Sequence, residues 1–199
     1  PHNAVMSLRC FVEDLATYAR STASREPLVI RLSEQEARHA RLSRRLSAGD
    51  PVVLFDGVGH FADGTIATAT KAVVEVTAGR IAFTSRPQPA LTLAVAMPKG
   101  PRQDVLIEKC TELGVAALQP LSAERSVAGA SDHRRDKWRR ATIEAAKQSG
   151  QCWIAELHAP MGIYYAYLDR APVFIIGATG PMAEPKRRPF IDWIHTANG

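Results

Sequence analysis

The stretch Pro98–Val127, PKGPRQDVLIEKCTELGVAALQPLSAERSV, decides the fold of this chain. It begins with a basic loop, continues as an amphipathic helix over 102–113, and passes a glycine into an apolar strand over 117–121. A helix between two apolar strands predicts a parallel α/β sheet. In such sheets ligands bind at the carboxyl ends of the strands. The polar residues Glu124-Arg125-Ser126, which follow the second strand, are therefore candidates for function.

The flanking sequence extends the α/β prediction over residues 90–199. A near-continuous apolar run at 91–97 is typical of a strand that is covered on both faces. The further elements that we predict are a helix over 132–149, a strand over 154–157, a helix over 161–169, a strand over 173–177 and a helix over 189–196.

Residues 7–86 predict a separate, β-rich unit. Short strands with turn residues between them indicate a barrel-like sheet; we predict them over 8–12, 28–32, 51–56, 61–67, 71–78 and 80–84. Ser33 with Glu36 three residues on is the capping-box signature of a helix start. Two prolines within 85–90 favour extended backbone and mark the boundary between the units.

Composition narrows the class of protein without deciding its function. The chain has 199 residues, a net charge of +5 and a pI near 9.4. This charge fits either a nucleic-acid-binding protein or simply a basic soluble one. The three cysteines lack the paired spacing of metal or disulfide sites, so we expect no metal and reduced thiols in a cytoplasmic protein. No apolar run reaches the length of about 20 residues that spans a bilayer.

The helix over 102–113 has two distinct faces at helical spacing. Leu106, Ile107, Cys110 and Leu113 share the apolar face, and the three acidic side chains on the opposite side are expected to be solvated. Lys109 lies at the border of the apolar face. Either it extends its amine harmlessly into water, or it supports a site.

The helix over 132–149 combines a small-residue face with a run of basic residues. Arg134 and Arg135 begin a run that suits RNA phosphate contacts, and a solvated charged face is the alternative. The small residues that line up with Trp138 predict a core or dimer contact. Gln148 lies beside this face as a possible hydrogen-bond donor to a nucleotide.

Four motifs carry a family resemblance: Pro98-Lys99-Gly100, Ile107–Val115, Pro120–Val127 and Ile143–Gly150. With them, the chain resembles the small-subunit ribosomal RNA uracil-N3 methyltransferases of the RsmE type, in the knotted SPOUT superfamily. The resemblance implies a PUA-like RNA-binding β-barrel at 7–86, followed by a SPOUT α/β domain with a mostly parallel sheet at 90–199. It also implies a cytoplasmic homodimer that transfers a methyl group from S-adenosylmethionine (SAM) to small-subunit ribosomal RNA.

The resemblance and the charge pattern together suggest roles for particular residues. Arg125, with Glu124 beside it, is the candidate for orienting the target or stabilising the uracil anion, because a guanidinium can bind an anion bidentately. A surface Glu–Arg pair is the alternative. The expected RNA contacts are Arg9, His39, Arg45, Lys99, Arg102, Arg134 and Arg135.

The cofactor pocket of such families is a knot built from a Gly-Pro-Glu-Gly-Gly turn and a later Leu-Arg … Glu-Thr-Ala stretch, and neither occurs in this sequence. We expect that the sequence stops before the knot; a diverged turn at 177–181 is the alternative. Residues that bind SAM are therefore expected beyond Gly199. A non-catalytic RNA-binding protein built on the same two domains is the alternative function.

Overall fold

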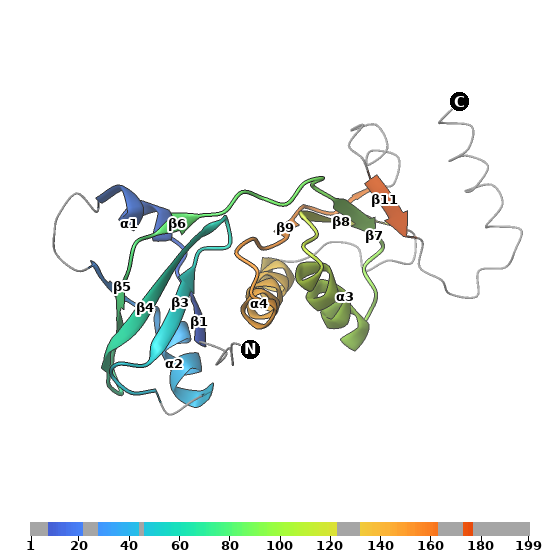
Figure 1. The fold of residues 1–199 in the computed structure, drawn as a ribbon. Helices are drawn as coiled ribbons and strands as arrows, with labels where there is room; N and C mark the ends of the chain where they lie inside the picture. Colours follow the sequence, from blue (N-terminus) through green and yellow to red (C-terminus); the bar gives the residue numbers. More distant parts are fainter. Residues whose placement is uncertain (1–7, 22–27, 44–45, 123–131, 163–172, 177–199) are drawn as a thin grey trace, which may run out of the picture.

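The computed structural model describes residues 8–21, 28–43, 46–122, 132–162 and 173–176. Within these ranges the chain forms two sheets with helices beside them (Figure 1). The predicted α/β class is confirmed. The limits 7–86 and 90–199 stay predictions.

The first sheet has the strand order β1-β3-β4-β5-β2, and β6 pairs with β4. The β1–β3 pair is parallel and the other pairs are antiparallel. The elements of this unit are β1 (Leu8–Phe11), α1 (Leu15–Ser21), β2 (Leu28–Arg31), α2 (Glu34–Ser43), β3 (Pro51–Phe55), β4 (His60–Ala69), β5 (Val74–Ala78) and β6 (Ala82–Phe83).

Alternating side chains give the first sheet one buried face. In β5, for example, Val74, Val76 and Ala78 are buried and the residues between them are half-buried, as expected for a strand with one face on a core. Cys10 from one edge strand and Ile30 from the other belong to the same core cluster as these residues. The sheet therefore curls around a single core, in agreement with the predicted barrel-like form.

The second sheet has the order β10-β8-β7-β11, with β9 also paired to β8, and every pair is parallel. Because helices usually connect parallel strands, their faces are covered, and β8 is buried from Ala117 to Leu121. The elements are β7 (Thr92–Val95), α3 (Pro101–Glu112), β8 (Ala117–Ser122), α4 (Asp132–Ser149), β9 (Glu156–Leu157), β10 (Met161–Gly162) and β11 (Val173–Ile176).

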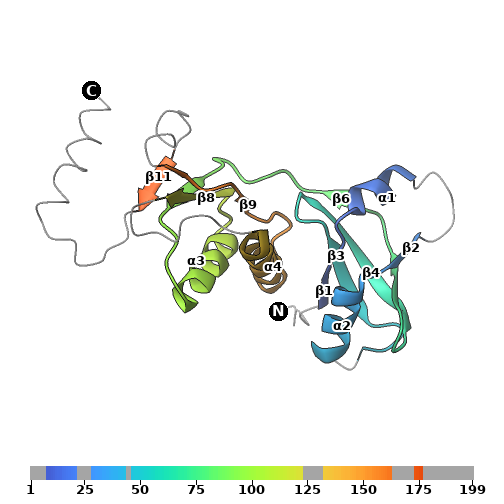
Figure 2. The same ribbon diagram turned by 180° about the vertical axis from the view of Figure 1, so that it is seen from behind.

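Helices α3 and α4 lie on the same side of the second sheet, and α4 stands between α3 and the first unit (Figures 1 and 2). Ile107 of α3 and Trp138 of α4 are buried in one cluster with Leu93 and Leu118 of the sheet. A hydrogen bond between the two helices reinforces this packing: Trp138 Nε1 donates to Gln103 Oε1 at 2.8 Å. Helix α4 is thus positioned to contact both units.

The structure corrects three sequence expectations. Helix α1 was not predicted. Leu113 is 82% exposed rather than part of the apolar face, because α3 ends at Glu112 and Leu113 is its C-cap before the left-handed Gly114. The helix expected over 161–169 is wrong where the chain is described, since Met161–Gly162 pairs with β8 as β10. The helix expected over 189–196 lies outside the described residues.

Candidate nucleic-acid interface

An apolar contact joins the first unit to α4. Phe55, at the end of β3, is fully buried in a cluster with Ile143 and Ala146 of α4. Phe11 packs edge-on against Phe55 with ring centroids 5.6 Å apart, and Ile154 packs against the same cluster. The burial of large apolar side chains on both sides holds the two units together.

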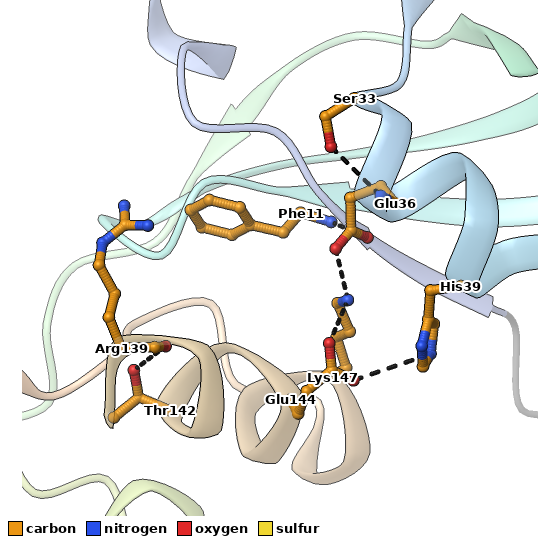
Figure 3. Close-up of polar contacts among 8 residues, drawn as sticks. All are labelled: Phe11, Ser33, Glu36, His39, Arg139, Thr142, Glu144 and Lys147. Atoms are coloured by element: carbon orange, nitrogen blue, oxygen red, sulfur yellow. Dashed lines mark hydrogen bonds and ion pairs between the residues drawn. The ribbon is translucent and has the colours of Figure 1, made fainter. Parts of the chain in front are cut away.

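A buried ion pair lies beside this cluster. Lys147 Nζ of α4 donates to Glu36 Oε1 of α2 at 2.6 Å and to Glu144 Oε1 at 2.8 Å (Figure 3). The second oxygen of Glu36 accepts the N–H of Phe11 at 3.0 Å. The Lys147 and Glu36 side chains are only 4% and 7% exposed. The Lys147 ammonium and the Glu36 carboxylate therefore form their ion pair in the protein interior, largely shielded from water.

The capping-box prediction at this point is half confirmed. The N–H of Glu36 donates to Ser33 Oγ at 3.2 Å, so Ser33 caps the helix as predicted (Figure 3). The Glu36 carboxylate, however, accepts from Phe11 and Lys147. A residue that the sequence assigns to local helix capping thus joins three elements of the fold.

The protonation of Lys147 follows from this geometry. Burial lowers the pKa of an amine, but hydrogen bonds and charge interactions with Glu144 and Glu36 outweigh burial and raise the pKa of Lys147 above its ordinary value. Lys147 therefore stays charged at neutral pH. His39 Nε2 lies 3.7 Å from the other oxygen of Glu144, which extends the same network toward the surface (Figure 3).

Backbone contacts connect the loop between β3 and β4 to the segment after α4. Ile154 N–H donates to Gly57 O at 3.0 Å and Gly59 N–H donates to Cys152 O at 3.1 Å. The Arg9 guanidinium donates to Gln151 O at 3.0 Å and lies over the Phe55 ring. The segment that leads into β9 is therefore part of the junction.

A groove of about 520 Å³ opens along this junction. It is formed by the β3–β4 loop, the start of the linker after β6, the first half of α4 and the approach to β9. Its lining includes the cations Arg86, Arg135 and Arg139 and the carboxylates of Asp136 and Glu156. Guanidinium groups bind phosphate oxygens bidentately, so the excess of cations suits an anionic ligand.

Two of these arginines are held by contacts, Arg139 by residues of the first unit and Arg86 by residues of the second. Arg139 Nη2 donates to Glu13 Oε1 at 2.7 Å, and its guanidinium lies 5.5 Å from the centre of the Phe11 ring. Arg86 Nη1 donates to Ala116 O at 3.3 Å while its guanidinium lies over Trp153. Arg135 is exposed on α4. The groove thus combines two arginines that are held by contacts, Arg86 and Arg139, with the exposed Arg135.

A second groove of about 560 Å³ is lined by Phe11–Asp14 together with residues of α2 and α4, and has a different charge balance. Its carboxylates belong to Glu13, Asp14, Glu36 and Glu144, and its cations are Arg31, Arg139 and Arg140. Lys147 pairs with Glu36 and Glu144, so this groove has no excess of cations to attract a polyanion. We therefore regard the first groove, which we call the arginine groove, as the candidate interface.

The strand-end loop at Pro98–Gly100 forms a second candidate region. Gln103 Nε2 donates to Pro98 O at 3.1 Å and so ties the loop to α3. Lys99 and Arg102 are exposed beside it. The carboxyl ends of β7 and β8 are neighbours, with Val95 opposite Pro120. The end of β8 therefore lies next to the strand that leads into this loop.

The structure places the predicted site residues in different surroundings. Glu124, Arg125 and Arg45 lie outside the described residues. Arg135 lines the arginine groove, whereas the neighbouring Arg134 is half-buried and does not. Their roles stay predictions.

Four further predicted residues have surroundings that favour a structural role or exposure. Arg9 is held at the junction, and His39 faces Glu144. Hydrogen bonds to Glu108 and Glu112 hold Lys109 on an exposed face of α3 and raise its pKa. Gln148 is exposed.

Several residues of the interface were not predicted. Arg86 lies within the proline-rich boundary segment, where the sequence indicates only extended backbone. Arg139 belongs to the basic run of α4 but was not singled out. Lys147 directly follows Ala145 and Ala146. A lysine inside an apolar stripe of a helix suggests that its charge has a buried partner, and this signal could have indicated the ion pair.

The described residues do not identify a SAM pocket. A cofactor pocket needs buried polar groups that are ready to bind it. At the strand-end loop, Pro98 O and the Gln103 side chain already have partners within the protein. We therefore assign no described residue to the cofactor. The described ranges also contain no cluster of three or more potential metal ligands, and no helix within them has the length and hydropathy to cross a membrane.

Comparison with known families decides what kind of protein has these two units. Residues 32–77 match the family model of the RNA methyltransferase PUA domain, and residues 84–176 match that of the RNA methyltransferase domain. The chain therefore carries a match to the RNA methyltransferase PUA domain followed by a match to the RNA methyltransferase domain. The PUA match falls on the first sheet, and the methyltransferase match spans α3, α4 and the parallel sheet.

Curated relatives agree with this family. A ribosomal RNA small subunit methyltransferase E of Synechocystis is 35% identical over 120 residues, which are 59% of this chain and 38% of the relative. The protein of that name from Mycobacterium tuberculosis is 34% identical over 118 residues, which are 57% of this chain and 45% of the relative. The matched segment thus spans less than half the length of these relatives.

Solved structures agree on the fold. A ribosomal RNA small subunit methyltransferase E from Neisseria gonorrhoeae, solved with S-adenosylmethionine, superposes with a TM-score of 0.72 at 21% identity, covering 93% of this chain and 85% of that chain. A putative methyltransferase from Legionella pneumophila, also with SAM, gives a TM-score of 0.70 at 21% identity, covering 92% and 84%. The PUA-like unit followed by a mostly parallel α/β domain is the fold of this chain.

Proposed function

We propose that this protein transfers a methyl group from S-adenosylmethionine to N3 of a uridine in small-subunit ribosomal RNA. The observation that carries the proposal is the succession of the two family matches, a PUA domain and then a methyltransferase domain, along one chain. The names of the curated relatives support the ribosomal substrate. The arginine groove between the two units supports an RNA partner.

The reaction exchanges a proton for a methyl group at the base. SAM supplies an electrophilic methyl group on its sulfonium and leaves as S-adenosylhomocysteine. The N3–H of uracil is acidic, so the protein has to accept or release this proton and stabilise the resulting anion. Positioning and charge stabilisation are the main contributions that protein side chains make to such a step.

We assign these contributions to the segment that follows β8. In the proposal, the Arg125 guanidinium binds the uracil anion, and Glu124 orients Arg125. Lys99 and Arg102 bind nearby phosphates from the neighbouring strand-end loop. The adjacency of the β7 and β8 carboxyl ends supports this assignment, because ligands of open α/β sheets bind at that edge.

The target uridine must be unpaired or extruded to reach such a site, as for other enzymes that modify bases. We propose that the arginine groove holds the flanking RNA and that the active protein is a homodimer in the cytoplasm. The basic first half of α4 and the net charge of +5 support the RNA contact.

The test is a methyl-transfer assay. The full chain encoded by the gene is incubated with SAM that carries an isotope-labelled methyl group and with unmodified small-subunit ribosomal RNA, and the nucleosides are analysed by mass spectrometry. Labelled 3-methyluridine is the expected product, and Arg125→Ala should abolish it. Labelled methyl groups at another atom or base would reject the N3 assignment.

A non-catalytic RNA-binding protein is the second candidate, and the arginine groove on described residues favours it. Salt-dependent RNA binding without SAM binding, measured by calorimetry on the same preparation, would favour this alternative. Binding of SAM together with transfer to RNA excludes it.

A further inference from the structure

An aromatic cluster lies beside the arginine groove and has no role in the proposed chemistry. It consists of His60 at the start of β4, Phe83 at the end of β6, and Trp153 from the segment after α4. The ring centroids of His60 and Phe83 are 5.0 Å apart, and those of Phe83 and Trp153 are 6.0 Å apart. Both units therefore contribute to one cluster.

Phe83 is the exposed member of this cluster. Its side chain is 58% exposed, and Val58, which lines the arginine groove, is 49% exposed. Val58 forms a backbone bridge with Trp153. Apolar groups side by side at a surface mark a binding site more often than scattered ones do.

The cluster is held rigidly before any ligand binds. Trp153 Nε1 donates to Thr84 O at 3.0 Å, and Thr84 N–H donates to Gly59 O at 2.9 Å. The buried Asp56 carboxylate contacts His60 Nδ1 at 2.7 Å and accepts the N–H of His60 at 3.0 Å. A rigid platform loses little conformational entropy when a flat ring binds to it.

Charge connects the cluster to the groove. The guanidinium of Arg86 lies 4.7 Å from the centre of the Trp153 ring, and Arg86 also lines the arginine groove with Arg135 and Arg139. An exposed aromatic ring next to a cationic groove is the combination that binds single-stranded nucleic acid: bases stack on the rings while phosphates contact the cations.

We propose that Phe83, supported by Trp153, His60 and Arg86, is a stacking site for one unpaired base of the RNA strand that lies in the arginine groove. The inference rests on the proposed function for the identity of the RNA. The stacked base is a flanking base and not the methylated one, because Phe83 belongs to the first unit and the proposed reaction takes place at the strand ends of the second.

The test measures binding of a fluorescently labelled single-stranded oligoribonucleotide and of the same strand with abasic positions. For Phe83→Ala we expect about tenfold weaker binding of the normal strand, in the range known for the loss of one stacked base. Binding of the abasic strand should not change. The slope of affinity against salt should stay the same, because the phosphate contacts remain.

Matched variants separate stacking from damage to the fold. Phe83→Trp should restore binding, and Val105→Ala, which removes an exposed apolar side chain of α3, should bind like the wild type. Equal affinity of Phe83→Ala and the wild type, or an equal loss for the normal and abasic strands, overturns the inference.

The methyl-transfer assay distinguishes failure of this inference from failure of the proposed function. Methylation by a protein whose RNA affinity is independent of Phe83 rejects the stacking site alone. Phe83-dependent binding of the normal strand without methyl transfer rejects the proposed reaction and keeps the stacking site.

Discussion

The Lys147 ammonium is buried between two carboxylates that come from different units of the protein. Its Nζ lies 2.6 Å from Glu36 and 2.8 Å from Glu144. A buried ion pair adds little net stability compared with apolar packing, but loss of one partner leaves an uncompensated charge. At the scale of single residues, this ion pair helps to fix the position of α4 against the first unit.

Replacement of Lys147 by methionine should destabilise the protein strongly. The Glu36 carboxylate would remain buried without its cation, at a cost of about 3–5 kcal/mol in the free energy of unfolding. Urea denaturation measures this loss. The matched control is Lys137→Met, whose partner Asp104 is half exposed, so the loss there should be below about 1 kcal/mol. Similar losses for both variants would contradict the account.

Stability should also fall at alkaline pH. Burial, and next the charge of Glu36, raise the pKa of Cys10 from 9.0 to about 12, while Lys147 opposes this shift. The folded protein thus keeps the Cys10 proton where the unfolded chain has lost it. The contribution is fully present below pH 9.0 and is lost as the pH rises toward about 12. The raised pKa of Lys147 acts in the same direction above 10.5.

The measurement is the free energy of unfolding as a function of pH under reducing conditions. Cys10→Ala should show a shallower decline than the wild type above pH 9.0. Two parallel curves would show that the Cys10 thiol has no part in the alkaline loss.

At the scale of elements, the loop between β3 and β4 depends on Gly59. Its φ of +103° is in the left-handed region, and a Cβ atom there would lie 2.6 Å from Thr84 O, 2.7 Å from Trp153 and 2.8 Å from Phe83. The backbone of this loop can therefore approach β6 and the segment before β9 only without a side chain. The aromatic cluster depends on that approach.

Gly59→Ala should cost more stability than an alanine at a left-handed glycine in open space. Gly150, with φ +75° and nothing within 4 Å of a built Cβ, is the matched control. Its replacement should cost about 1–2 kcal/mol for the backbone conformation alone. Thermal unfolding of both variants checks the difference. A smaller loss at Gly59 than at Gly150 would mean that Phe83 and Trp153 move apart easily.

Elements with strong periodicity were predicted well from the sequence. The predicted helix over 132–149 coincides with α4, and the strand over 117–121 is β8 without its last residue, because long apolar patterns and glycine stops are local signals. Helix α1 and β10 were missed because they are short and depend on packing. Glu36 was interpreted as a capping residue, since its partner Lys147 lies 111 positions away.

At the scale of the whole molecule, the function that we propose depends on a surface to which both units contribute. The arginine groove takes Arg86 from the linker after the first sheet and Arg135 and Arg139 from α4. The sequence indicated the basic run of α4 but not its neighbours, because a groove between units depends on their relative orientation. The apolar contact of Phe55 with Ile143 and the buried Lys147 ion pair fix that orientation.

Photo-crosslinking of RNA that carries 4-thiouridine, followed by mass spectrometry of the crosslinked peptides, tests most directly that RNA lies between the two units. The account predicts crosslinks on both sides of the arginine groove, in peptides that contain Phe83–Arg86 and peptides that contain Arg135–Arg139. Crosslinks confined to one unit, or to the second groove beside Asp14, would contradict it.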